Sequence, residues 1–270
     1  MASLTAEQGT PDVLWESIRQ EVTDMAAREP VLASFFYASI LSHHSLEEAL
    51  AYTLAQQLGN GVLSDLSIHQ VLLEAMTEDT ETRDRMRRDL SAYVERDPAC
   101  NHYCMPLLYF KGFHALQVHR VANWLWRRQR RSLALFLQNR ASEVFGVDIH
   151  PAAEIGGGIM IDHATGLVIG ETSVVEDNVS MLHSVTLGGT GALAGDRHPK
   201  IRCGVLIAAG AKILGNIEVG QGAKVGAGSL VLESVPAHTT VVGVPAKVVG
   251  HPREAEPSRE MDQRINGGEG

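Results

Sequence analysis

The chain has 270 residues, of which 44% are hydrophobic and 20% are charged, and its formal net charge is -9 at pH 7. Nucleic-acid binding without sequence preference needs an excess of Lys and Arg, so this acidity argues against it. No apolar run approaches the roughly 18 residues of a membrane span, and the N-terminus lacks the pattern of a secretion signal. We therefore expect a cytoplasmic protein with no nucleic-acid or membrane partner.

The three cysteines are Cys100, Cys104 and Cys203. They are too few, and odd in number, for a disulfide framework. No second Cys or His pair at zinc-site spacing accompanies Cys100 and Cys104 in the sequence. We expect three reduced thiols and no metal site.

The first 145 residues show helical periodicity and capping signals. Thr10, Pro11 and Asp12 form a helix start, and Pro30 breaks that helix. Ser45, with Glu48 three residues later, is a capping box that opens a helix ended by Gly59 and Asn60. Further apolar patterns predict helices over 66–76, 80–95, 107–128 and 131–145. We predict an all-helical domain over residues 1–145, with surplus apolar residues that contact another subunit.

From Asp148 to Val235 an aliphatic residue recurs every six positions. A period of six fits neither a helix nor a simple strand, but it fits a short strand and a tight turn repeated as one unit. Three units make a triangular coil whose recurring side chains stack inward. The alternative is a β-sandwich with coincidental spacing. We predict a parallel β-helix over residues 146–250 and a flexible tail over 251–270. The recurring residues are Ile149, Ile155, Ile161, Ile169, Val175, Met181, Leu187, Ile201, Ile207, Ile213, Val219, Val225 and Val231.

The repeat slips first between Ile161 and Ile169, where two extra residues accompany the run Asp162-His163-Ala164-Thr165-Gly166. Because the inward side chains are aliphatic, chemistry must come from such turns. A histidine oriented by a carboxylate is a common general base for removing a hydroxyl proton. Asp148 is the candidate partner of His163, because fifteen residues are almost one 18-residue coil.

A second slip is the insertion from Gly188 to Lys200, which contains Gly-Gly-Thr-Gly and then Asp196-Arg197-His198-Pro199-Lys200. A glycine-containing loop that ends in adjacent cations suits the binding of a carboxylate or a phosphate. A flexible surface loop with scattered charges is the alternative. His183, in MLHSVTLGG, has two interpretations: it contacts the substrate or CoA, or it is packed in a turn.

Several of these motifs resemble bacterial serine O-acetyltransferase. DHATG, GGTG and GDRHPKI occur in that family's order, and the upstream DPA and PLLYFKGFHALQVHRVANWLW resemble its helical domain, so the likeness covers roughly residues 10–250. The resemblance implies an α+β fold, with an N-terminal all-helical domain followed by a left-handed parallel β-helix of hexapeptide repeats. It also implies a homohexamer, a dimer of trimers with the helical domains at the centre.

The same resemblance implies the reaction and its residues. The enzyme would transfer the acetyl group of acetyl-CoA to L-serine by direct attack, in the first step of cysteine biosynthesis, and L-cysteine would inhibit it at the serine site. Family members that bind the sulfhydrylase use a C-terminal isoleucine, whereas this chain ends with Gly270. By this resemblance His163 is the general base, and Asp148 orients its imidazole. Asp97 and Asp162 would bind the ammonium group of the substrate, and Arg197 and His198 its carboxylate. The implied CoA-binding residues are Gly189, Ala209 and Lys224.

Three other functions fit the repeat. Histidines of neighbouring β-helices can hold zinc, as in a carbonic anhydrase of this architecture, but the repeat contains no His-x4-His pair. The β-helix could also be a scaffold without catalysis. A CoA-dependent acyltransferase for a sugar or antibiotic is the third alternative, and the charges of Arg197 and Asp97 favour a small zwitterion over it.

Overall fold

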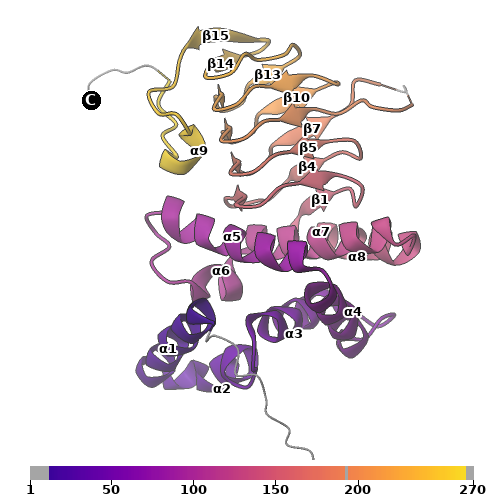
Figure 1. Cartoon of the computed structure of the whole chain (residues 1–270), viewed down its shortest axis with the longest axis vertical. Helices are drawn as coiled ribbons and strands as arrows, with labels where there is room; N and C mark the ends of the chain where they lie inside the picture. Colours follow the sequence, from indigo (N-terminus) through magenta and orange to yellow (C-terminus); the bar gives the residue numbers. More distant parts are fainter. Residues whose placement is uncertain (1–11, 192–193, 266–270) are drawn as a thin grey trace, which may run out of the picture.

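The computed structural model describes residues 12–191 and 194–265. Helices form the lower half of the molecule, and the β-strands stack above them as successive coils (Figure 1). No helix among the described residues combines the length and the apolar character needed to cross a bilayer. The helices of the lower half are α1 (Val13–Arg28), α2 (Ala33–Phe36), α3 (Leu46–Leu58), α4 (Asp65–Glu78), α5 (Thr80–Arg96), α6 (Cys104–Tyr109), α7 (Lys111–Arg127) and α8 (Arg131–Phe145).

The helix starts follow the capping signals in the sequence. Asp12 accepts a hydrogen bond from the Trp15 amide at 3.2 Å, while Thr10 and Pro11 lie outside the described residues. Ser45 accepts from the Glu48 amide at 3.2 Å and begins α3. These contacts satisfy amide groups that have no partner within the helix.

The single helix predicted over 107–128 is wrong. The chain breaks at Phe110, whose backbone is extended, and forms α6 and α7 instead. The Phe110 ring packs against Tyr93, with the ring centroids 5.7 Å apart. Two residues later, a Cβ at Gly112 would lie 2.0 Å from the carbonyl oxygen of Ile161. The break lets the start of α7 approach the β-helix at a distance that only glycine permits.

The β-helix has three faces, each a sheet of strands that pair in parallel from coil to coil, apart from the last pair of the six-stranded sheet. Ile149, Ile169, Leu187, Ile213 and Val231 stack in register on one face. The five-stranded sheet holds β1 (Val147–Ile149), β4 (Leu167–Ile169), β7 (Thr186–Gly188), β10 (Lys212–Leu214) and β13 (Leu230–Val231). The four-stranded sheet holds β2 (Glu154–Ile155), β5 (Val174–Val175), β8 (Lys200–Ile201) and β11 (Glu218–Val219). The six-stranded sheet holds β3 (Met160–Ile161), β6 (Ser180–Met181), β9 (Leu206–Ile207), β12 (Lys224–Val225), β14 (Thr240–Gly243) and β15 (Ala246–Gly250).

The period-six residues line the interior as predicted. Every one of them is at most 4% exposed. Burying aliphatic side chains in such stacks stabilises each coil on its neighbour. The fold class, helices followed by a parallel β-helix, is therefore confirmed. The last pair, β14 and β15, is antiparallel and ends the six-stranded sheet.

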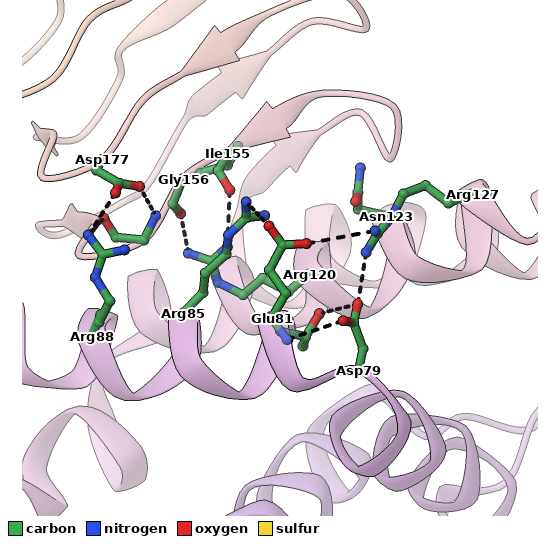
Figure 2. Close-up of polar contacts among 12 residues, drawn as sticks. Asp79, Glu81, Arg85, Arg88, Arg120, Asn123, Arg127, Ile155, Gly156 and Asp177 are labelled. Atoms are coloured by element: carbon green, nitrogen blue, oxygen red, sulfur yellow. Dashed lines mark hydrogen bonds and ion pairs between the residues drawn. The ribbon is translucent and has the colours of Figure 1, made fainter.

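Two buried charged residues, one on α5 and one on α7, cover the open edge of the first coil. Asp89 and Arg120 form an ion pair at 2.7 Å, with both side chains almost fully buried. Arg120 donates to the carbonyl oxygens of Ile155 (3.2 Å) and Gly156 (2.7 Å), as Figure 2 shows. Asp89 accepts from the Ile159 amide at 3.0 Å. These side chains replace the hydrogen bonds that a preceding coil would supply.

The segment after β15 returns along the six-stranded sheet. Residues 257–260 form α9 (Pro257–Glu260), which packs between α5 and β9. The Ser258 carbonyl accepts from Ser180 Oγ at 2.8 Å, and Ser180 also accepts from Arg96. The helices end at Phe145 and the strands begin at Val147. The boundaries 1–145, 146–250 and 251–270, and the flexibility of the tail, stay predictions.

Candidate active site

His163 stands at an outer corner of the first coil, in the turn 162–166 that joins β3 to β4. Its side chain is 73% exposed. His163 and Ala164 both adopt left-handed backbone conformations, with φ of 57° and 58°. Non-glycine residues rarely adopt this conformation, and such strain concentrates at functional sites. The two extra residues of the first slip therefore build a turn that presents an imidazole to solvent.

Two carboxylates were predicted near His163. Asp162 Oδ2 lies 3.6 Å from His163 Nε2, which is too long for a hydrogen bond. Asp148 lies on β1, and its Oδ1 accepts from Gln138 Nε2 at 2.7 Å. The strand register aligns Asp148 with Val168, because the first slip lengthens this coil by two residues. The pairing of Asp148 with His163 stays a prediction, and Gln138 is an orienting residue that the sequence did not reveal.

Asp97 directly follows the last residue of α5, a helix that contacts the first coil. Tyr93, one helical turn before Asp97, donates through its hydroxyl to the Ile161 carbonyl at 2.9 Å and accepts from the Ile161 amide at 3.1 Å. Ile161 directly precedes Asp162 and His163. Asp162 and the exposed imidazole thus share one corner, and Tyr93 joins α5 to the residue before them.

Arg197 and His198 belong to the insertion between β7 and β8. They pack against the next corner of the coil below, the turn between β4 and β5. Arg197 Nη2 contacts Glu171 Oε2 at 2.6 Å, and the Arg197 amide donates to Thr172 Oγ1 at 3.0 Å. His198 is 6% exposed. Burial, with the charge of Arg197 as a second cause, lowers the pKa of His198 below its ordinary value. Glu171 and Thr172 hold this pair, and neither stood out in the sequence.

The two corners are separated by the width of the five-stranded sheet. Between them runs β4, three residues or about 10 Å at the rise of a strand. Asp162 and His163 stand before this strand, and Glu171 and Thr172, the contacts of Arg197 and His198, stand after it. The site residues of one chain therefore divide into two groups, at the two ends of β4.

A column of residues continues from His163 along the coils. The register of β3, β6 and β9 aligns His163 with His183 and then with Ala209. The two imidazole rings meet edge to face, with the centroids 5.9 Å apart. His183 Nδ1 is buried and has no hydrogen-bond partner among the described residues. The imidazole of one coil is thus followed by a small side chain two coils later.

The other two predicted CoA contacts lie apart from this column. A Cβ at Gly189 would lie 3.6 Å from Arg197 Cγ, so Gly189 stands beside the second corner. Lys224, on β12, is 4% exposed, and its Nζ donates to the Arg264 carbonyl at 2.5 Å. Burial lowers the pKa of Lys224. The returning C-terminal segment therefore covers Lys224.

A cleft of about 750 Å³ lies elsewhere, between α5, α7 and the four-stranded sheet. Arg85, Arg127 and Trp126 line its helical wall, and Glu154 and Glu176 line its strand wall. Figure 2 shows that Arg85 and Arg127 both turn toward Glu81. The cleft contains none of the predicted site residues. Within residues 12–191 and 194–265 no group of three His, Cys, Asp or Glu side chains is arranged to hold a metal ion.

Comparison with known proteins identifies the family. The N-terminal domain model of serine acetyltransferase matches residues 14–118, and the bacterial transferase hexapeptide model matches residues 198–233. The serine acetyltransferase of Salmonella typhimurium is 56% identical over 256 residues, which are 95% of this chain and 94% of that protein. This chain belongs to the serine acetyltransferase family. It is therefore an enzyme of the acyltransferase class.

Solved serine acetyltransferases share the whole architecture. The Vibrio cholerae enzyme is 57% identical with a TM-score of 0.93, covering 94% of this chain and 98% of that one. The Brucella abortus enzyme in complex with coenzyme A is 52% identical with a TM-score of 0.88, covering 91% and 98%. The soybean enzyme complexed with serine is 54% identical with a TM-score of 0.87, covering 89% and 100%. A further serine acetyltransferase, in complex with cysteine, is 52% identical with a TM-score of 0.91, covering 94% and 98%.

Proposed function

We propose that this enzyme transfers the acetyl group of acetyl-CoA to the hydroxyl of L-serine, giving O-acetyl-L-serine and CoA. The exposed His163, in its strained turn beside Asp162, carries the proposal. The relatives complexed with serine and with coenzyme A support the two substrates. The reaction would be the first step of cysteine biosynthesis from serine.

In this mechanism His163 is the general base. It takes the serine hydroxyl proton while the serine oxygen bonds to the thioester carbonyl carbon. The tetrahedral intermediate then breaks its carbon–sulfur bond, and the departing thiolate takes the proton from the imidazolium. Asp148, held by Gln138, orients the imidazole and stabilises its positive charge.

The state of the thiols supports direct attack without an acetyl-enzyme. Burial raises the pKa of Cys100 to about 11 and that of Cys104 to about 12. The pKa of Cys203 is also raised, with burial as the largest cause. Only a thiolate is an effective nucleophile, so none of the three is activated.

A zwitterion needs charges of both signs around it, and the two corners offer them. Asp97 and Asp162 bind the ammonium group, and Arg197 and His198 bind the carboxylate. Because one chain keeps these groups apart, a neighbouring copy supplies the second pair. L-cysteine has the same two charged groups and inhibits by binding there, as the relative complexed with cysteine suggests. CoA lies in the groove between copies, along Gly189 and Ala209, and contact with Lys224 requires displacement of the C-terminal segment that covers it.

The enzyme is a homohexamer, a dimer of trimers joined through the helical domains. Large apolar side chains remain exposed on those helices and their loops, among them Val31 (84%), Val62 (88%) and Leu66 (65%). Light scattering is expected to give six times the 29.2 kDa of one chain. A fully active monomer would contradict both the assembly and the shared site. The sequence leaves the partnership with the sulfhydrylase in doubt, and residues 266–270 lie outside those described.

The reaction is tested by measuring free thiol released from acetyl-CoA. L-serine, L-homoserine, a sugar acceptor and no acceptor are compared with the same enzyme preparation. We expect release that depends on L-serine and far exceeds the other three. Thiol release with another acceptor but not with L-serine would mean that the substrate assignment is wrong. No release with any acceptor would favour a scaffold without catalysis.

A further inference from the structure

The amide, the carbonyl and the hydroxyl of Thr172 all form hydrogen bonds with the segment that carries Arg197 and His198. Its hydroxyl oxygen accepts from the amides of Arg197 (3.0 Å) and His198 (3.1 Å). The same oxygen lies 2.8 Å from His198 Nδ1. Its carbonyl accepts from Lys200 Nζ at 2.6 Å, and its own amide donates to His198 Nδ1 at 3.2 Å. One residue at a coil corner thus fixes the end of a thirteen-residue insertion.

These contacts determine which nitrogen of His198 carries the proton. A backbone amide can only donate, so Nδ1 of His198, which receives the Thr172 amide, must be an acceptor. The Thr172 hydroxyl oxygen already accepts from two amides, which leaves its proton to point at the same Nδ1. In the neutral imidazole the proton therefore resides on Nε2. Burial and the neighbouring charge of Arg197, which lower the pKa of His198, favour that neutral form.

His198 Nε2 is not one of the fully buried side-chain atoms that lack a partner among the described residues, so its N–H can reach a ligand. A Cβ at Gly170 would lie 2.0 Å from His198 Nε2 and 2.1 Å from Cδ2, so the ring rests on the glycine backbone. No described residue accepts a hydrogen bond from Nε2. Arg197, held by Glu171 at 2.6 Å, supplies the positive charge beside it.

We propose that Thr172 is the positioning residue of the carboxylate site, which it builds by fixing the Arg197–His198 backbone and by holding His198 as the Nε2–H tautomer. The site then offers a carboxylate one charged donor, from Arg197, and one neutral donor, from His198. This inference rests on the proposed function for the identity of the carboxylate, that of L-serine. The tautomer itself depends only on the contacts within the chain.

Thr172→Val tests the role of the hydroxyl with little change in side-chain volume. The KM for L-serine is expected to rise about tenfold or more, the loss of one or two net hydrogen bonds. The kcat should stay within about twofold, because the base is untouched. Thr172→Ser keeps the hydroxyl and should restore the KM for L-serine to within about threefold.

Thr239→Val is the matched control, since Thr239 is another corner threonine, buried, whose hydroxyl bonds a backbone carbonyl. This variant also loses a buried corner hydroxyl, but it should leave the KM for L-serine unchanged. An unchanged KM in Thr172→Val would overturn the proposal. So would a Thr172→Ser variant as impaired as Thr172→Val.

The tautomer is read without substrate by solid-state 15N spectra of histidine-labelled enzyme. The His198 signals are identified by their loss in His198→Gln. We expect an unprotonated Nδ1 and a protonated Nε2 in the native enzyme; a protonated Nδ1 would refute the assignment. Should native enzyme release no CoA with L-serine, the proposed function fails, while the spectra still decide the tautomer.

Discussion

Replacing His163 with alanine is expected to lower kcat for L-serine by about a thousandfold, within the range of 10² to 10⁴ typical of a lost general base. The KM values should change little, since the imidazole acts on the reacting hydroxyl and does not hold the charged ends of the substrate. Steady-state thiol release at saturating acetyl-CoA measures both quantities. The remaining activity would come from the orientation of the two substrates in the site.

The turn around His163 is strained, so the effect of the backbone must be separated from that of the base. His163→Asn is the suitable second variant, because asparagine tolerates the left-handed conformation but cannot take the proton. It should be as inactive as His163→Ala. His238 is a matched control, being an exposed corner histidine with φ of 50°. His238→Ala should keep full activity, and an active His163→Asn variant would exclude His163 as the base.

The β-helix could be predicted because its inward positions accept only aliphatic side chains. From Ile149 to Val231 this requirement recurs every six residues, apart from the two slips. Helix starts were equally local, since Asp12 and Ser45 each bond an amide three residues away. The break at Phe110 was not predictable, because it depends on Tyr93 and on the contact of Gly112 with a distant carbonyl.

The site divides in the same way. His163 and Arg197 could be found because they sit where the repeat is interrupted, and a solenoid carries its chemistry at such interruptions. Thr172 and Glu171 interrupt nothing and are separated from their partners by an insertion that hides the register. Gln138 lies on a helix, where no pattern points to Asp148. The positioning residues thus come from pairings that only the folded chain reveals.

The buried contacts between α5, α7 and the first coil give the largest expected effect on stability. Arg120→Ala is expected to lower the free energy of unfolding by about 3–5 kcal/mol, because it leaves the buried carboxyl of Asp89 without its ion-pair partner. Urea midpoints at a fixed chain concentration measure the change, since assembly makes the stability concentration-dependent. Arg202→Met removes an exposed ion-pair partner of Glu176 and Glu218 and should change the free energy by less than about 1 kcal/mol.

Removing both charges separates the two roles of this pair. An isolated buried ion pair can often be replaced by apolar residues without loss of stability. Here Arg120 also bonds the carbonyls of Ile155 and Gly156, and Asp89 also bonds the Ile159 amide. An Asp89→Leu, Arg120→Met variant therefore leaves three backbone groups of the first coil without partners, each costing about 1–3 kcal/mol if buried. We expect the double variant to stay well below native stability. Native-like stability would mean that Asp89 and Arg120 only neutralise one another and that the coil edge does not depend on them.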